Sequence, residues 1–275
     1  MKIDYTFHSH TFRCNHAEGD IEDYVSLAIK NGMKIYGVSD HVFLPGVSEP
    51  KTRGEFSCLE GYIEAFKESK KKHQNQIEMY LGFECEYASV FEDYYKSLLY
   101  EKGFDYLICG QHNGFDENKN YIHLVKNHFR DEIEDLDEYV KEVKDAIRSG
   151  LFLYIAHPDL LFISAKEVTP ELERLSDEII ECATQNNAVF EINIHGLYRQ
   201  EKNAPYGNIG YPASYFWKKV AKTNIRVVYG GDYHFLWEVG DKHLEEKLNE
   251  FIKECNIKLS DIKEIYKEYR ERIKK

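Results

Sequence analysis

Residues 7–16, FHSHTFRCNH, place three histidines close together in a chain that has only 12 histidines among 275 residues. An H-x-H pair at the end of a strand points both side chains to the same side, so His8 and His10 can hold one ion together. His16 follows in the same short stretch. If these three histidines bind metal, the remaining ligands must come from other parts of the chain.

The other candidate ligands lie directly after short apolar runs. They are Asp40 and His41, Glu84, His112, His157, and Asp232 and His234. Imidazole and carboxylate together suit zinc, iron or manganese, whereas an all-oxygen set would favour magnesium or calcium. The set is too large for one tetrahedral ion. The sequence therefore predicts two or three divalent ions, with a carboxylate, Glu84 above all, bridging a pair.

The apolar runs that precede these residues read as strands that alternate with amphipathic helices. Strands are expected at 2–7, 34–39, 77–83, 104–110, 151–156, 188–193 and 225–230. Helices are expected between Asp20 and Gly32 and at 57–73, 90–101, 133–149, 170–185, 212–223 and 243–255, with a polar outer helix at 260–274. Seven βα units around a mostly parallel sheet bring the ends of the strands to one rim, where active sites of barrels are built.

The domain organisation is predicted by searching the sequence for segments that could separate domains. We find no repeat, low-complexity segment or Gly/Ser linker, so a single domain over residues 1–275 is expected. The longest irregular stretches are 42–56 and 113–130, which are expected to be loops after the second and fourth strands. Loops of this length in a compact domain are usually functional.

Composition narrows the class of protein. A net charge of -12 argues against a broad nucleic-acid surface, and an anionic substrate would need local compensation such as bound cations. The start of the chain does not look like a signal peptide and no window is apolar enough to span a membrane, so a cytoplasmic protein is expected. The six cysteines lack CxxC spacing and are expected to be free thiols, several of them buried.

Taken together, the sequence motifs resemble those of the polymerase and histidinol phosphatase (PHP) family of metal-dependent phosphoesterases. The resemblance rests on HSH at 8–10, His16, SDH at 39–41, GFE at 82–84, GQH at 110–112, AHPD at 156–159 and GGDYH at 230–234. It implies a distorted (β/α)7 TIM-like barrel with a trinuclear metal centre. Chain length and loop pattern most resemble the histidinol-phosphatase branch, which implies L-histidinol phosphate as substrate, in histidine biosynthesis.

The resemblance also implies a distribution of ligands. His8, His10, Glu84 and Asp232 would hold the first ion, Glu84, His112 and His157 the second, and His16, His41 and His234 the third. Asp40 would then orient a ligand imidazole. The resulting hypothesis is that a hydroxide shared by the ions that Glu84 bridges attacks phosphorus, while the third ion binds the phosphate. Asp232 or a metal-bound water would protonate the leaving alkoxide.

Substrate-binding residues are harder to predict. Arg53 and Arg199 lie in loops that should reach the same rim and could bind phosphate, although a surface role is at least as compatible with the sequence. Glu191 and Asn193 could meet the amine and imidazole of histidinol phosphate, and His195 could line the pocket or only complete a loop. His73, His123, His128 and His243 are expected to have no role in the site.

Two other functions are compatible with the sequence. A phosphoesterase of the same family could act on nucleotides or oligonucleotides, although the chain lacks a basic stripe. A non-enzymatic metal-binding barrel is a second alternative, disfavoured because structural zinc sites are closed and usually have four ligands around one ion.

Overall fold

A computed structural model describes residues 1–49, 51–122, 125–126, 132–133, 135–203 and 208–274. The strands are β1 (Tyr5–Thr6), β2 (Ile35–Val38), β3 (Glu78–Cys85), β4 (Tyr106–Cys109), β5 (Gly114–Phe115), β6 (Tyr121–Ile122), β7 (Val125–Lys126), β8 (Glu132–Ile133), β9 (Val189–Asn193) and β10 (Arg226–Gly230). The helices are α1 (Ile21–Lys30), α2 (Leu59–His73), α3 (Glu92–Tyr100), α4 (Leu136–Ser149), α5 (Pro170–Gln185), α6 (Ile194–Asn203), α7 (Ser214–Val220), α8 (Lys242–Cys255) and α9 (Ile262–Ile273). Short 3-10 turns connect several of these elements.

The central sheet is parallel and curled. Strands β1, β2, β3 and β4 pair in that order, and β9 pairs with β10 in a second parallel ladder. Single-residue bridges connect the two ladders at both edges, because Ile155 pairs with Cys109 and Phe190, and Ser9 pairs with Tyr233. The prediction of an α/β fold with a mostly parallel sheet is confirmed.

The prediction of a regular fifth strand at 151–156 is wrong. Only Ile155 of this segment forms bridges, although Leu153 donates to Leu107 O and Ile155 donates to Val189 O, at 2.7 and 2.9 Å. In total, three backbone hydrogen bonds join the segment to β4 and two join it to β9, but the pairing is regular only at Ile155. An apolar run signals burial, but burial alone does not tell whether the backbone pairs continuously.

Two further segments differ from the sequence expectation. Helix α6 begins at Ile194, directly after β9, where the sequence suggested a loop around His195. The stretch 113–130, expected to be irregular, contains strands of the short antiparallel pairs β5–β6 and β7–β8. His123 and His128 lie outside the described residues. The other expected helices are present, with ends that shift by a few residues, as is usual.

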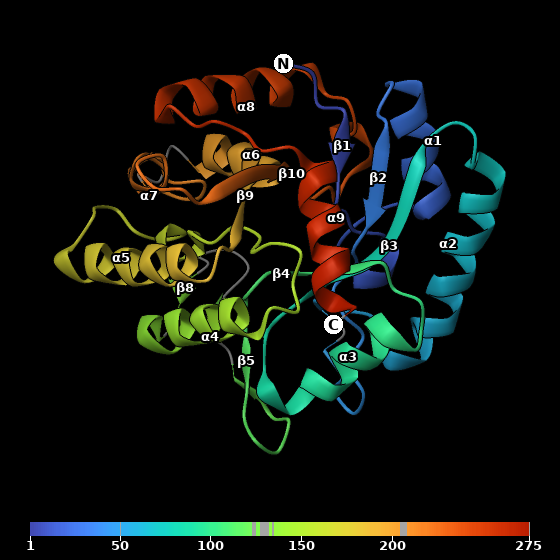
Figure 1. Ribbon diagram of the computed structural model, residues 1–275, viewed down its shortest axis with the longest axis horizontal. Helices are drawn as coiled ribbons and strands as arrows, with labels where there is room; N and C mark the ends of the chain where they lie inside the picture. Colours follow the sequence, from blue (N-terminus) through green and yellow to red (C-terminus); the bar gives the residue numbers. More distant parts are fainter. Residues whose placement is uncertain (50, 123–124, 127–131, 134, 204–207, 275) are drawn as a thin grey trace.

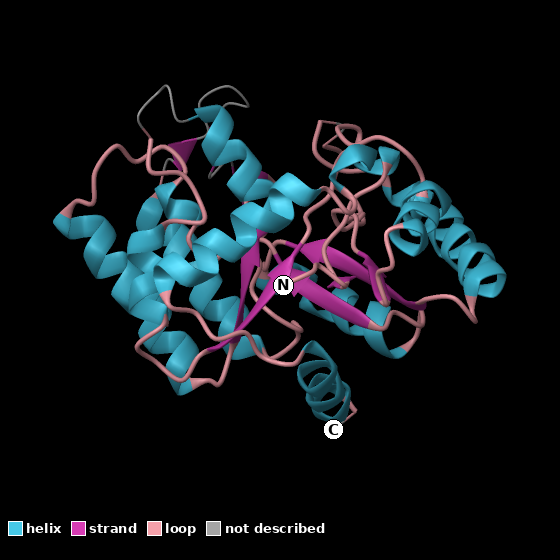
Figure 2. Ribbon diagram, turned by 90° about the horizontal axis from the view of Figure 1, so that it is seen from above, coloured by secondary structure: helices cyan, strands magenta, loops and turns pink. Residues whose placement is uncertain are grey.

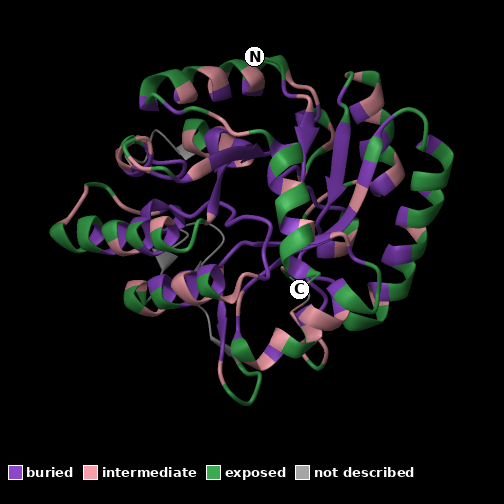
Figure 3. Ribbon diagram, viewed as in Figure 1, coloured by how far each residue is buried: buried purple, intermediate pink, exposed green. Residues whose placement is uncertain are grey.

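Helices cover both sides of the sheet. Helices α1, α2 and α3 lie along one side, and α4 to α8 lie along the other (Figures 1 and 2). The strands are buried, and each flanking helix buries only the side chains that face them (Figure 3). Asp20 caps α1, the helix expected between Asp20 and Gly32, with a capping box, and Tyr24, Val25 and Ala28 lie on its buried face.

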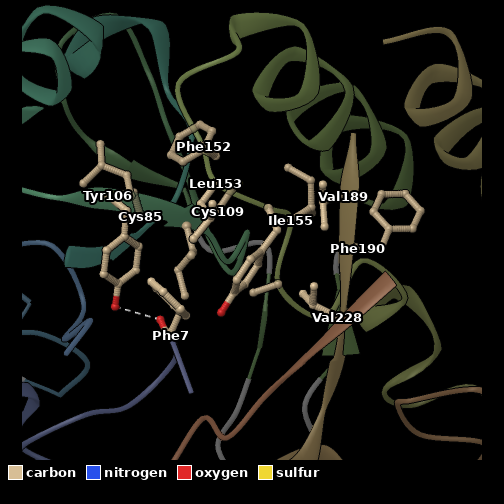
Figure 4. Packing of buried hydrophobic residues seen from close by; sticks show 14 of the residues in the cluster. Phe7, Cys85, Tyr106, Cys109, Phe152, Leu153, Ile155, Val189, Phe190 and Val228 are labelled. Atoms are coloured by element: carbon tan, nitrogen blue, oxygen red, sulfur yellow. Dashed lines mark hydrogen bonds between the residues drawn. The ribbon is translucent and has the colours of Figure 1, made fainter. Parts of the chain in front are cut away.

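One hydrophobic cluster extends from Ile3 to Ile273 among the described residues. Side chains from neighbouring strands meet inside it, and the Tyr106 hydroxyl donates to Phe7 O at 2.9 Å (Figure 4). All six cysteines are free and all except Cys58 are buried, as expected. Among the described residues, no helix combines the length and apolar character needed to cross a membrane.

Helix α9 packs across the N-terminal ends of the strands. Tyr269 donates its hydroxyl proton to Leu151 O at 2.9 Å and accepts a hydrogen bond from Leu107 N at 3.2 Å. Ile262, Ile265 and Ile273 are also buried on its inner face. The expectation of a polar outer helix describes only its solvent side, and the opposite, C-terminal ends of the strands remain available for a site.

Candidate metal centre

The predicted ligands converge at the C-terminal ends of the strands because the strands are parallel and adjacent. His8 follows β1, His112 follows β4, and Asp232 follows β10. Glu84 lies inside β3, one position before its end, and pairs with His41 in a backbone bridge. Residues that are far apart in sequence therefore share one buried volume.

Glu84 occupies the middle of the cluster, and its carboxylate is only 1% exposed. Its Oε1 atom lies 3.0 Å from His157 Nε2, 3.3 Å from His8 Nε2 and 3.8 Å from His112 Nε2. Its Oε2 atom lies 2.9 Å from His41 Nδ1 and 3.5 Å from His10 Nε2. A single carboxylate is thus shared by several imidazoles, the arrangement expected of a bridging ligand.

Asp232 joins the first two histidines. Its Oδ1 atom lies 2.9 Å from His10 Nε2 and 3.2 Å from His8 Nε2. These two Nε2 atoms are buried and, within the described part of the chain, have no hydrogen-bond partner of acceptable geometry. Nitrogen and oxygen atoms about 3–4 Å apart without hydrogen-bond alignment are typical of ligands around one ion, since each metal–ligand bond is about 2.0–2.2 Å.

His16 and His234 face each other in a way that favours a cation between them. The Nδ1 atom of His16 lies 2.8 Å from Cys14 O, and Nδ1 of His234 lies 2.8 Å from Asp232 O. A carbonyl accepts only, so both Nδ1 atoms carry the proton and both Nε2 atoms present lone pairs. The two Nε2 atoms are 3.1 Å apart. A bound cation would relieve the repulsion between these lone pairs.

The pKa values of the cluster divide the candidate ligands into two groups. Burial lowers the pKa of His41 to about 3, so this ring is neutral at ordinary pH. At His8 and His112 burial is outweighed by neighbouring carboxylates, which raise the pKa, so these two rings would release a proton when metal binds. Burial opposes ionisation of Glu84 and Asp232, but the neighbouring imidazoles hold the pKa of both carboxyl groups well below the usual range. Neutral imidazole and ionised carboxylate are the forms that coordinate metal.

Backbone conformation at two candidate ligands is strained. His157 and Asp232 have φ angles of 32° and 52°, in the left-handed region that non-glycine residues seldom adopt. Such residues cost about 1–3 kcal/mol each and are concentrated at functional sites. Glycines in the motifs leave room for carboxylates: a Cβ on Gly110 would lie 1.8 Å from Glu84 Oε1, and one on Gly230 would lie 2.0 Å from Glu191 Oε2.

Glu191 and Asn193, predicted to contact the substrate, are fully buried and contact candidate ligands. Glu191 Oε2 lies 2.9 Å from His8 Nδ1, and Asn193 Nδ2 donates to Asp232 Oδ2 at 3.1 Å. Partners of this kind fix the orientation and tautomer of a metal-binding histidine. Asp40, expected to orient an imidazole, lies 3.9 Å from His10 Nδ1, and it accepts a hydrogen bond from Thr11 N at 2.7 Å.

Arg53, predicted to be near the rim, is 1% exposed and forms a buried ion pair. Its Nη2 atom donates to Glu86 Oε1 at 2.8 Å, and Glu86 Oε1 lies 3.7 Å from His112 Nδ1. Sequence reasoning missed Glu86. The signal was available, because Glu86 stands two positions after Glu84 and directly after the end of β3, the kind of position that the other candidate ligands occupy.

His195 and Arg199 both lie on α6, the helix that the sequence did not predict. His195 Nδ1 lies 2.6 Å from the buried carboxylate of Glu238, and the His195 ring is 5.0 Å from the ring of His234. Arg199 is half-buried, with its guanidinium carbon 6.0 Å from the centre of the Tyr211 ring. The Tyr211 ring is 5.7 Å from the ring of His157. Helix α6 therefore borders the cluster.

The donor set fits divalent metal ions. Groups of three candidate ligand atoms within 4.8 Å of one another include His10, His41 and His234, as well as His8, His10 and Glu84 and also His8, His157 and Asp232. Carboxylate and imidazole donors in several such groups suit more than one first-row ion. His112 is 27% exposed, so solvent and a small substrate can reach this side of the cluster.

Comparison with known proteins agrees with this reading. The chain is 23% identical over 272 residues to a protein of Schizosaccharomyces pombe named a probable histidinol-phosphatase, an alignment that covers 91% of this chain and 86% of the relative. It is 20% identical over 276 residues to a protein of Acetivibrio thermocellus named a probable phosphatase, with 100% and 98% covered.

A solved structure and a family model define the fold and the family. Histidinol phosphate phosphatase from Lactococcus lactis subsp. lactis Il1403, solved with zinc, L-histidinol and phosphate, superposes with a TM-score of 0.67 at 17% identity. The superposition covers 94% of this chain and 95% of that protein. The model of the PHP domain matches residues 6–195, more than half of the chain. The buried histidine and carboxylate cluster thus lies in a chain that belongs to the PHP domain family.

Proposed function

We propose that this protein is a metal-dependent phosphomonoesterase that hydrolyses L-histidinol phosphate to L-histidinol and phosphate in histidine biosynthesis. The observation that carries the proposal is the pair of Nε2 atoms of His16 and His234, which face each other at 3.1 Å next to His41, whose Nδ1 atom lies 2.9 Å from the shared carboxylate of Glu84. A purely structural role would not require so many buried nitrogen and oxygen atoms without hydrogen bonds at one rim. Two distant relatives named as phosphatases support the same class.

The proposed ligand sets follow the family pattern. His8, His10, Glu84 and Asp232 would hold one ion, Glu84, His112 and His157 a second, and His16, His41 and His234 a third. Zinc, iron and manganese are the ions expected of these donors. When bound, such ions lower the pKa of water and draw the phosphoryl oxygens onto positive charge.

The protein groups have separate tasks in this proposal. Asp232 or a metal-bound water would protonate the leaving alkoxide. Because the pKa of Asp232 lies well below its usual range, this carboxylate would have to pass on a proton taken from a neighbouring imidazole or water, and its Oδ1 atom lies within 3.2 Å of nitrogens of His8 and His10. Arg199 is the candidate for binding phosphate from α6. Glu191, Asn193 and Arg53 are proposed to orient ligands rather than to contact the substrate, because they are buried behind His8, Asp232 and Glu86.

We also propose that the curled sheet is a closed, distorted (β/α)7 barrel that forms one domain over residues 1–275. The bridges at Ile155 and at Ser9 support closure, since each joins the β9–β10 ladder to an edge of the four-stranded sheet. A closed barrel would hold the ligand-bearing ends at fixed distances, as catalysis by several ions requires.

The test is release of inorganic phosphate from L-histidinol phosphate by protein reconstituted with manganese, iron or zinc. A nucleotide monophosphate, a 3',5'-bisphosphate nucleotide and an aryl phosphate serve as comparison substrates. We expect a strong preference for histidinol phosphate that chelation abolishes. A metal-dependent preference for a nucleotide would support the nucleotide alternative, and no release from any ester with metal bound would support a non-enzymatic protein.

A further inference from the structure

Three aromatic side chains form a group at the edge of the candidate site, here called the aromatic rim: Tyr198, Phe235 and Trp237. Phe235 and Trp237 are 36% and 47% exposed. The Tyr198 and Trp237 rings meet edge to face at 5.1 Å, and Phe235 and Trp237 lie parallel at 6.5 Å. Burying such large rings would be favourable, so their exposure to water suggests that a ligand covers them.

The aromatic rim is continuous with the candidate metal centre. The His195 ring is 5.9 Å from Tyr198 and 6.3 Å from Phe235, and it is 5.0 Å from the ring of His234. A line of rings therefore leads from a candidate metal ligand to Trp237. A molecule whose phosphate lies at the metal centre could extend along this line.

The turn that carries Phe235 and Trp237 is held rigidly. The carboxylate of Glu238, which is 1% exposed, accepts hydrogen bonds from His234 N at 2.7 Å and Phe235 N at 2.9 Å. Its other oxygen contacts His195 Nδ1, and Leu236 N donates to Glu18 at 2.8 Å. Rings fixed in this way lose little conformational entropy when a ligand stacks on them.

The chemistry of the aromatic rim favours one occupant. Aromatic faces attract other flat rings by stacking and need no matched hydrogen bonds. Lys202 Nζ lies 5.4 Å from the centre of the Tyr198 ring, which favours a neutral ring over a strongly cationic one. Three side chains are far too few for a stable protein interface, which needs about 800 Å² from each partner.

We propose that Tyr198, Phe235 and Trp237 form the subsite for a flat aromatic or heteroaromatic ring on the alcohol part of the phosphomonoester. This inference rests on the proposed phosphatase function and deepens it by naming the residues that select the substrate. Histidinol phosphate and nucleotides both carry such a ring, whereas glycerol phosphate does not.

Fluorescence tests the subsite without turnover. The chain has two tryptophans, and Trp217 is fully buried, so a ligand that stacks on the aromatic rim should change mainly the emission of Trp237. We would titrate metal-loaded protein with L-histidinol, adenosine and glycerol. A saturable change with at least one ring-bearing alcohol, absent with glycerol and lost in Trp237→Phe, supports the proposal. No change with either ring-bearing alcohol overturns it.

Kinetics test whether the aromatic rim selects substrates. In Trp237→Ala we expect the KM of the best ring-bearing ester, divided by that of glycerol phosphate, to rise at least about fivefold. Trp237→Phe should recover most of this ratio because it keeps a ring. Tyr100→Ala removes a 57% exposed aromatic side chain at the end of α3, near the opposite end of the sheet, and should leave the ratio unchanged.

The possible failures are distinct. A KM ratio unchanged in Trp237→Ala, with activity present, overturns the subsite and leaves the proposed phosphatase function intact. Absence of phosphate release from every ester in the unmutated protein refutes the phosphatase function, and the fluorescence titration then still decides whether the aromatic rim binds rings.

Discussion

At the N-terminal ends of the strands, α9 covers the sheet and its polar groups pair with strand backbones, whereas at the C-terminal ends several buried nitrogen and oxygen atoms face one another without hydrogen bonds. Arg270 Nη1 donates to Asp105 O at 2.6 Å, and Arg272 Nη2 donates to Phe152 O at 2.8 Å. By contrast, His8 Nε2, His10 Nε2 and Glu84 Oε2 have no hydrogen-bond partner among the residues that the structure describes. The contacts at the N-terminal end stabilise the fold. The arrangement at the C-terminal end lowers stability and favours ligand binding.

The largest effect is expected at the C-terminal end, in Glu84→Ala. This variant loses the carboxylate that several imidazoles share, so turnover should fall more than about 100-fold, beyond the 10–100-fold typical of residues that only orient a ligand. Phosphate release, metal content and circular dichroism should show an inactive protein with an unchanged fold. Near-normal activity with full metal occupancy would refute the role of Glu84 as a shared ligand.

At the N-terminal end, Tyr269→Ala should affect stability instead of chemistry. The side chain is 2% exposed and hydrogen-bonds two strand segments, so the free energy of unfolding should fall by about 3–5 kcal/mol. Urea unfolding measures this loss, and kcat per folded molecule should be unchanged. Tyr269→Phe, which removes only the hydroxyl, should lose about 1–3 kcal/mol. A large change in kcat would contradict the separation of the two ends.

A third test concerns Glu191, which lies at the C-terminal end but below the opening. Glu191→Gln weakens the contact with His8 Nδ1, so metal affinity should fall roughly tenfold while KM changes little. Competition with a fluorescent chelator measures affinity, and steady-state kinetics measure KM. A raised KM with unchanged metal affinity would instead restore the sequence-based expectation that Glu191 contacts the substrate.

A further effect is expected from pH, through Glu142 on α4. Burial raises the pKa of this carboxyl group from 4.5 to about 8, against the opposing hydrogen bond from Gln111. The folded state therefore keeps a proton that the unfolded state releases. Its stabilising contribution is complete below about pH 4.5 and is lost as pH rises through about 8.

Glu142→Gln should remove this pH dependence. At pH 9 the Tm of this variant should exceed that of the unmutated protein, by about 2–4 °C for each kcal/mol of unfolding free energy that the ionised Glu142 costs. At pH 4.5 the two Tm values should be similar. Glu181→Gln, which removes an exposed carboxyl group on α5, should show no such difference. The same Tm difference at both pH values would argue against a buried, protonated Glu142.

Local pattern predicted most of the secondary structure and the types of the candidate ligands. The failures share a cause. The segment 151–156 was expected to be a strand because it is apolar, and α6 was missed because Gly196 and His195 follow a strand without a clear helical period. In both cases contacts from other segments decide the backbone conformation, and sequence periodicity does not record these contacts.

The sequence by itself determined which residue types stand after each strand, and hence that imidazoles and carboxylates gather at one rim. Only the tertiary structure decided which of them touch. His16 and His234 are 218 positions apart, and their 3.1 Å contact depends on the curl of the sheet and on two loop conformations. The burial of Arg53, Glu191 and Asn193 behind the candidate ligands likewise depends on how neighbouring strands and loops pack. Such distances are set by long-range packing, which no local spacing encodes.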